Sequence, residues 1–330
     1  MGATPILPVD EFMHEPTDHP QFNESAYYNF VDGDSGYGLL IRMGNRVNEG
    51  HAEVTVVVYL PGGAAAIRFD RAPIASNDAF DAAGLRFDVI EPLETMQVSF
   101  SGTAYLLPKG TDLSDPKRAF TTSPQVPVNL GLRYESLIPV YGLGEGSGIQ
   151  GAEDAIAVGH YQGPCRVSGW VELDGERRDV NGLGYRDHSW GPRKWLGPSY
   201  WRWLSCLADD KNGFVAWSQK IGDERSPGNG MVLRDGVREL VTKVDVTSEY
   251  GPAPYYPTSM SVRMQTESGE VVTATGEVFH NVPLRHRRGE EVARLTEVLV
   301  RFDINGTTGY GICEYHDLMH DGVPAGMSEA

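Results

Sequence analysis

Short runs of alternating apolar and polar residues, separated by turn dipeptides, recur along most of this 330-residue chain. The clearest turns are Asp174-Gly175, Asp235-Gly236, Ser268-Gly269 and Asn305-Gly306. Asn-Gly and Asp-Gly favour the two-residue turn of a β-hairpin, because both turn positions need a positive φ. No window of a dozen residues shows a good helical period. The sequence therefore predicts a nearly all-β sandwich or barrel.

Composition limits the partners and the compartment. A net charge of −17 argues against nucleic acid, since phosphate binding needs a basic surface, and an apolar content of 40% argues against disorder. Cys165, Cys206 and Cys313 are few and far apart, so neither a disulfide framework nor a zinc cluster is expected. No run reaches membrane-spanning length and the N-terminus lacks signal-peptide features, so we expect a cytoplasmic protein without membrane insertion.

Two regions carry weaker signals. Residues 108–151 show no convincing periodicity, and the glycine-rich run Gly142–Gly148 predicts a loop. The alanine clusters at 64–66 and 79–83 predict a turn of helix at most.

The stretch from residue 181 to residue 195 reads Asn-Gly-Leu-Gly-Tyr-Arg-Asp-His-Ser-Trp-Gly-Pro-Arg-Lys-Trp. Its glycines and proline force turns or close backbone approach around a short extended run. In such a run, alternate side chains face opposite sides. One side carries Arg186, His188 and Trp190, and the other carries Tyr185, Asp187 and Ser189. Either this is a polar edge strand, or it is the floor of a pocket with its charge set by Asp187 or Arg193; the sequence leaves open which side faces inward.

This stretch, with Tyr200–Trp203 and Asp210–Trp217 after it, resembles the hydroxyneurosporene synthase (carotenoid hydratase) and AttH-like group. Phe22–Phe30, an acidic residue followed by aromatics, resembles the opening strand of that group. The resemblance spans roughly residues 20 to 317, and its specific part is Asp-His-x-Trp-Gly at 187–191. It implies two lipocalin-like antiparallel β-barrel or sandwich domains in tandem, with little helix. We place them at residues 1–195 and 196–330.

The resemblance also implies a cofactor-independent lyase that adds water to, or removes it from, a carbon–carbon double bond of a hydrophobic small molecule. A terpenoid, a steroid or an aromatic compound would qualify. The active-site His and Trp of the group correspond to His188 and Trp190. Where the carotenoid hydratases have a Tyr and an Asp, this chain has Val215 and Trp217, which puts carotenoid hydration itself in doubt.

Such a reaction needs a proton donor, a surface that stabilises positive charge and control of one water. A protonated His188 or a neutral carboxyl group could donate the proton. The ring faces of Trp190 and Trp203 could stabilise a cation.

The last predicted hairpin brings two carboxylates together. A two-residue turn at Asn305-Gly306 sets Glu297 directly opposite Glu314, on a face that also carries Tyr310 and His316. Like charges in opposed positions are unfavourable. Solvent, a nearby arginine, or protonation of one carboxyl in a dry pocket must compensate, and the last of these would make one glutamate a general acid.

The predicted catalytic residues are His188, Asp187, Glu314 and Glu297. The predicted substrate-binding residues are Trp190, Tyr185, Arg193, Trp203, Tyr310 and His316. Tyr185 is alternatively a core aromatic, and Arg193 alternatively pairs with surface carboxylates. His160 could reach the site, although no spacing supports it. We expect no metal, because the four-residue spacing of His316 and His320 suits a helix, whereas a strand is predicted there.

Three other functions compete with the lyase. An isomerase or cyclase could use the same scaffold, and a non-catalytic carrier of an apolar ligand would have a pocket without converging titratable groups. A carbohydrate-binding sandwich would instead present an exposed platform formed by Trp190, Trp195, Trp201 and Trp203. Exposed edges of open sheets also make a homodimer plausible.

Overall fold

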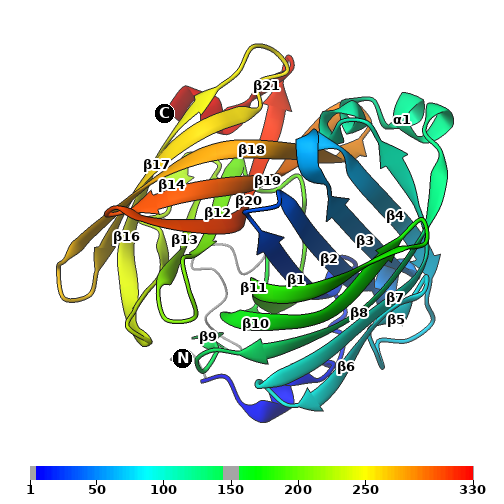
Figure 1. Cartoon of the computed structure of the whole chain (residues 1–330), viewed down its shortest axis with the longest axis horizontal. Coiled ribbons are helices and arrows are strands. Elements are labelled where there is room, and N and C mark those ends of the chain that lie inside the picture. Colours follow the sequence, from blue (N-terminus) through cyan, green and yellow to red (C-terminus); the bar gives the residue numbers. More distant parts are fainter. Residues whose placement is uncertain (1–4, 144–155, 330) are drawn as a thin grey trace.

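The computed structural model describes residues 5–143 and 156–329, and it is all-β, with 66% strand and 8% helix. Its strands form two large antiparallel sheets that lie side by side (Figure 1). The predicted fold class is therefore confirmed. Gly142–Gly148, which we predicted to be a loop, lies mostly outside the described residues, and only the edge of it is seen in a short strand.

The N-terminal sheet closes into a barrel. Its strands are β1 (Phe22–Asp32), β2 (Tyr37–Arg46), β3 (His51–Tyr59), β4 (Ala65–Pro73), β5 (Asp81–Ala82), β6 (Leu85–Glu91), β7 (Thr95–Leu107), β8 (Gln125–Ser136), β9 (Tyr141–Leu143), β10 (Gly159–Leu173) and β11 (Glu176–Pro192). The ring runs β4-β3-β2-β1-β11-β10-β8-β7 and returns to β4. The strands β5, β6 and β9 lie outside it.

The C-terminal sheet closes in the same way. Its strands are β12 (Tyr200–Leu207), β13 (Gly213–Ile221), β14 (Glu224–Arg225), β15 (Asn229–Arg234), β16 (Val237–Tyr250), β17 (Pro257–Thr266), β18 (Val271–Arg288), β19 (Glu291–Ile304), β20 (Thr307–His320) and β21 (Val323–Pro324). The ring runs β12-β13-β15-β16-β17-β18-β19-β20 and returns to β12. The chain changes sheet between Pro192 and Tyr200, and the domain limits 1–195 and 196–330 remain predictions.

Helix is confined to short pieces. They are α1 (Pro116–Thr122) and the 3₁₀ segments η1 (Pro8–Glu11), η2 (Val47–Glu49), η3 (Pro61–Gly63), η4 (Gly110–Ser114) and η5 (Ala325–Glu329). Residues 108–151 showed no convincing periodicity in the sequence, yet the structure places the helix α1 and the strand β8 there. Strand β8 alternates apolar and other residues, and its apolar side chains are buried. Its proline and glycine conceal this pattern in the sequence.

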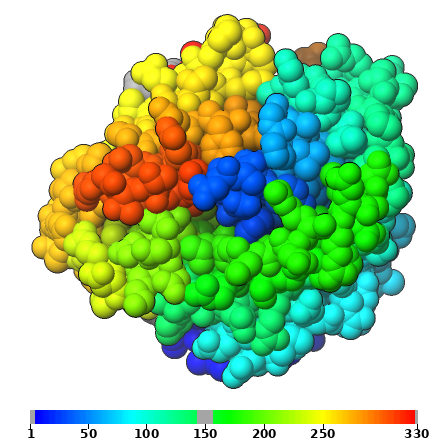
Figure 2. All heavy atoms as spheres, in the orientation of Figure 1, coloured from blue at the N-terminus to red at the C-terminus, as the bar shows by residue number. Residues whose placement is uncertain are grey.

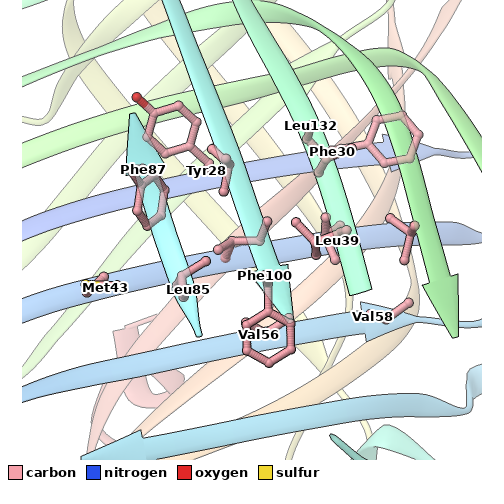
Figure 3. Packing of buried hydrophobic residues seen from close by; sticks show 14 of the residues in the cluster. Tyr28, Phe30, Leu39, Met43, Val56, Val58, Leu85, Phe87, Phe100 and Leu132 are labelled. Carbon is pink, nitrogen blue, oxygen red and sulfur yellow. The ribbon is translucent and has the colours of Figure 1, made fainter. Parts of the chain in front are cut away.

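Three apolar cores hold the molecule together. One fills the N-terminal barrel, where Tyr28, Phe30 and Leu39 pack against Phe100 and Leu132 (Figure 3). A second fills the C-terminal barrel around Phe214 and Phe302. The third lies between the barrels and draws on both, for example Tyr27 and Leu40 from one and Leu299 and Ile312 from the other. The barrels are therefore joined by a continuous buried layer, and their surfaces meet closely (Figure 2).

The glycines of the motif at 181–195 have a structural reason. A Cβ atom at Gly184 would overlap the carbonyl oxygen of Asn29 on β1, so only glycine allows the two strands to approach so closely here. This approach fixes β11 against β1, and with it the direction of the side chains that follow.

Closure of both rings of strands affects the prediction that the protein forms a homodimer. Each ring strand is paired on both sides, so the open edges that suggested a homodimer are not found in the rings. The homodimer stays a prediction without that support. Within the described part of the chain, no helix has the length and apolarity needed to cross a bilayer.

The turn at Asn305-Gly306 offers a test of the hairpin that joins β19 and β20. Asn305 has φ 52° and Gly306 has φ 87°, as a type I′ turn requires. Gly306→Ala places a side chain in the left-handed region and should lower the free energy of unfolding by about 1 to 2 kcal/mol. Urea denaturation measures this change. The exposed neighbour Thr308→Ala is the control, and equal stability of the two variants would contradict the turn assignment.

Candidate active site

A small polar cavity lies between the barrels, where β1 and β11 face β12 and β20. Its volume is about 60 Å³, which is room for a few water molecules. The titratable groups in its wall are Asp187, His160, Glu314, Arg42 and Arg193. Its aromatic groups are Tyr27, Trp195, Trp201, Trp203 and Trp217. The cavity therefore combines acids, bases and indole rings.

The wall from the N-terminal barrel comes from one side of β11. Asp187 and Ser189 line the cavity, as alternation along the strand predicts, so the odd-numbered side of the motif faces this cavity. The neighbouring strand β10 sets His160 opposite Ser189, and the His160 ring makes a short hydrogen bond with the Asp187 carboxylate. These two side chains are 20% and 19% exposed, so the pair retains contact with solvent.

The wall from the C-terminal barrel contains the glutamate pair. Glu297 on β19 is paired with Glu314 on β20, which confirms the predicted register. Glu297 is 1% exposed and Glu314 is partly exposed, so at least one of the two carboxyls is removed from solvent. The Trp201 indole donates a short hydrogen bond to Glu314, and the Tyr27 hydroxyl donates to Glu297 at 3.5 Å.

Burial makes this pair hold a proton. It raises the pKa of Glu297 well above its usual value, and the charge of Glu314 and a hydrogen bond to it raise that pKa further. Burial also raises the pKa of Glu314, while hydrogen bonds from Glu297 and Trp201 act in the opposite direction. We therefore place the shared proton on Glu297, donated toward Glu314.

Two half-buried arginines border the cavity. Arg193 donates to the carbonyl of Ile156 at 2.8 Å and to the Ser189 hydroxyl at 2.9 Å. Burial, helped by the charge of Arg42, lowers the pKa of Arg193 to about 10. Burial likewise lowers the pKa of Arg42. Arg193 thus holds the cavity wall through neutral partners, and it makes no ion pair with a carboxylate among the described residues.

Indole rings form the apolar part of the wall. Trp201 and Trp217 stack with their centroids 5.7 Å apart, and the Trp203 indole donates to Gln162 at 2.8 Å. The indole N–H groups of Trp195 and Trp217 are buried and have no partner among the described residues. They are therefore available to a ligand oxygen.

The tryptophans do not form a carbohydrate platform. Trp190, Trp195, Trp201 and Trp203 are all at most 8% exposed. An exposed stacking surface is therefore excluded for these residues.

His188 and Trp190 lie on the other side of β11, inside the N-terminal barrel, and line none of the described cavities. His188 Nε2 lies 2.6 Å from Glu24 Oε1, and its Nδ1 lies 3.0 Å from the Tyr161 hydroxyl. Trp190 stacks on His14 with centroids 3.8 Å apart. The predicted site requires His188, Asp187 and the glutamate pair to meet in one cavity. The structure instead places His188 on the opposite side of β11 from that cavity.

The other predicted binding residues are distributed unevenly. Trp203 lines the cavity. Tyr185 is buried between the barrels and donates to the carbonyl of Phe214 at 3.0 Å, as a core aromatic would. His316 stacks on Trp201 and bonds the Trp195 carbonyl at 2.8 Å, and burial lowers its pKa to about 3. Tyr310 packs near Phe279, away from the cavity.

A larger apolar cavity of about 230 Å³ adjoins the first. Arg42 and Trp195 line both cavities, so they stand between them. Its apolar walls are Leu40, Phe69, Leu113, Phe120, Leu284 and Leu295. Glu314 lines the small cavity and Glu297 lines the large one, so the glutamate pair touches both spaces.

Several cavity residues escaped the sequence-based prediction. His160 was noticed without support, and the pairing of β10 with β11 is what brings it to Asp187. Arg42 and Tyr27 lie on β2 and β1, far from the motif in sequence, and only barrel closure brings them to it. Alternation from the motif alone gives no signal for them.

The chain belongs to the family described as a domain of unknown function, DUF7064, whose model matches residues 7–319. No curated protein matches the sequence. Family membership thus covers nearly the whole chain and carries no activity with it.

Solved structures share the fold over almost the entire chain. CghA, determined with Sch210972, has a TM-score of 0.59 at 9% identity and covers 99% of this chain and 96% of its own. Kievitone hydratase from Nectria haematococca has a TM-score of 0.57 at 11% identity, covering 95% of each chain. A protein described as AttH from Nitrosomonas europaea has a TM-score of 0.53 at 16% identity, covering 94% and 98%. The AttH-like resemblance is thus borne out at the level of fold, whereas hydroxyneurosporene synthase itself is not singled out.

The proton on Glu297 has a consequence for stability. The unfolded carboxyl loses its proton near its ordinary pKa, while the folded one keeps it to higher pH, so the protein loses stability as pH rises through this window. The slope should be about 1.4 kcal/mol per pH unit for one retained proton. Glu297→Gln, which mimics the protonated form, should remove this slope.

Urea denaturation of wild type and Glu297→Gln at about pH 5.5 and about pH 7.5 measures the effect. The variant should gain stability relative to wild type at the higher pH. The exposed Glu277→Gln is the matched control and should follow wild type. A pH-independent difference between Glu297→Gln and wild type would show that the pair does not retain a proton.

Proposed function

We propose that this protein is a lyase of the hydratase or dehydratase type that acts on a hydrophobic small molecule in the space between its barrels. The observation that carries this proposal is the convergence of Asp187 and Glu314 on one small cavity, with Glu314 hydrogen-bonded to a protonated Glu297. A proton donor and a proton acceptor thus face the same small space, which has room for a few water molecules. The name of kievitone hydratase, which shares the fold, supports the same class of reaction.

Hydration of a double bond would proceed in two steps. Glu314, after receiving the shared proton from Glu297, donates it to one alkene carbon, and the π electrons form the new C–H bond. Positive charge develops on the other carbon, where the indole rings that line the small cavity stabilise it. Water then adds to this carbon, and Asp187 with His160 accepts the proton that the water loses. Dehydration follows the same steps in reverse.

The two cavities suggest how a substrate would be held. The apolar cavity accommodates a hydrocarbon body, such as part of a terpenoid, steroid or aromatic compound, while the reacting bond enters the polar cavity. The unpartnered N–H groups of Trp195 and Trp217 are suitable donors to a substrate oxygen. Because acid, base and rings all come from this chain, the reaction as proposed needs no cofactor.

Two other functions remain outcomes of the test. An isomerase or cyclase would use the same donor and rings without adding water, and one fold neighbour, CghA, was determined with the compound Sch210972. A carrier would bind its ligand in the apolar cavity and leave the acidic groups idle. The titratable groups that converge on the polar cavity favour an enzyme over a carrier.

A ligand screen followed by mass spectrometry tests the proposal. Terpenoids, steroids and aromatic alcohols that raise the melting temperature are incubated with the protein, and products are examined for gain or loss of one water. Glu314→Gln and Asp187→Asn should each lower kcat by about 100- to 10,000-fold while ligand binding persists.

The control variant is the exposed Glu277→Gln, which should retain full turnover. His188→Ala changes the side of β11 that faces away from the cavity and removes no group from the cavity wall. It therefore distinguishes a role of that side from a role of the cavity. Products of unchanged mass would establish an isomerase or cyclase, and binding without product in wild type would establish a carrier. Full turnover in Glu314→Gln would overturn the assigned acid.

A further inference from the structure

A second cluster of titratable groups lies inside the N-terminal barrel, on the side of β11 that faces away from the cavity. It joins three parts of the chain: His14 in the lead-in before β1, Glu24 on β1 and His188 on β11. The lead-in is held close by, because Glu11 accepts a short hydrogen bond from buried Arg186. The proposed reaction uses none of these groups.

The three side chains direct their ligand atoms at one another. His14 Nδ1 lies 2.9 Å and His188 Nε2 lies 2.6 Å from Glu24 Oε1, and the available ligand atoms all lie within 4.8 Å of one another. The side chains of Glu24 and His188 are 0% and 3% exposed, and that of His14 is 18% exposed. Two imidazoles and a carboxylate form one of the ligand sets found in zinc sites.

The outer nitrogen of each imidazole also has a partner. His14 Nε2 lies 3.6 Å from an oxygen of Asp10. His188 Nδ1 lies 3.0 Å from the Tyr161 oxygen, and the Tyr161 hydroxyl donates its own proton to Glu11 at 2.9 Å. The Tyr161 oxygen therefore accepts from His188 Nδ1–H, so loss of the proton that Nε2 shares with Glu24 would leave Nε2 able to bind a metal. Outer partners of this kind orient metal-bound histidines.

We propose that His14, Glu24 and His188 bind a divalent transition-metal ion, with zinc the preferred ion, and that this ion fastens the lead-in to β1 and β11. Metal-to-ligand distances of about 2.0 to 2.2 Å need ligand atoms somewhat farther apart than the hydrogen-bonded ones here. The partly exposed His14 side chain can rotate to widen its own contact with Glu24. The 2.6 Å contact between His188 and Glu24 must widen by a small rotation of the Glu24 carboxylate. The ion would replace the protons that the three groups now share.

Zinc binding to the untagged full-length protein tests the site, after treatment with a chelator and dialysis. Isothermal titration and elemental analysis should find one zinc per chain in wild type. His14→Gln, which alters the partly exposed lead-in and leaves both barrel side chains in place, should abolish this binding. Asp10→Asn should weaken it by about 10- to 100-fold, because it removes only the outer partner.

The exposed His320→Gln is the matched control and should bind zinc as wild type does. Cobalt substituted for zinc should give the absorption bands of a nitrogen- and oxygen-ligated ion, and zinc should raise the melting temperature of wild type but not of His14→Gln. Circular dichroism checks that each variant is folded. Equal zinc binding by wild type and His14→Gln, or binding by neither, would overturn the proposal and leave the three groups as a hydrogen-bonded network.

Discussion

The placement of two opposed glutamates between the barrels is the interaction on which the proposed chemistry of this molecule depends. The hairpin of β19 and β20 forces Glu297 and Glu314 into register, and packing between the barrels buries Glu297 and part of Glu314. Two carboxylates cannot both be ionised there at modest cost, so the pair retains a proton. A neutral acid is thereby kept beside a cavity that also contains the carboxylate of Asp187.

The strand β11 connects this chemistry with the architecture. Its odd-numbered side presents Asp187 and Ser189 to the space between the barrels, while its even-numbered side places Arg186 and His188 inside the N-terminal barrel against the lead-in. The charged and titratable residues of the motif at 181–195 therefore lie in two different environments. One environment is suited to acid–base chemistry, and the other holds the N-terminal segment in place.

Local rules predicted much of this structure. Turn dipeptides and alternation gave the all-β class, the two sides of β11 and the pairing of Glu297 with Glu314, because each follows from strand geometry. The sequence could not predict which side of β11 faces the cavity between the barrels. That choice depends on how the second barrel packs against the strand. Arg42 could not be predicted, because it lies on β2, which is far from the motif in sequence. The position of His160 could have been predicted, since a two-residue turn at Asp174-Gly175 sets it opposite Ser189. The strand β8 was missed because Pro127 and Gly131 interrupt its pattern.

The protonated glutamate pair can be observed directly by infrared difference spectroscopy at neutral pH. Wild type should show the carbonyl stretch of a protonated carboxyl, sensitive to exchange into D₂O, and Glu297→Gln should lack it. Such a band would establish a stored proton beside the cavity, as the proposed reaction requires. A spectrum identical in wild type and Glu297→Gln, with no protonated carboxyl in either, would contradict it.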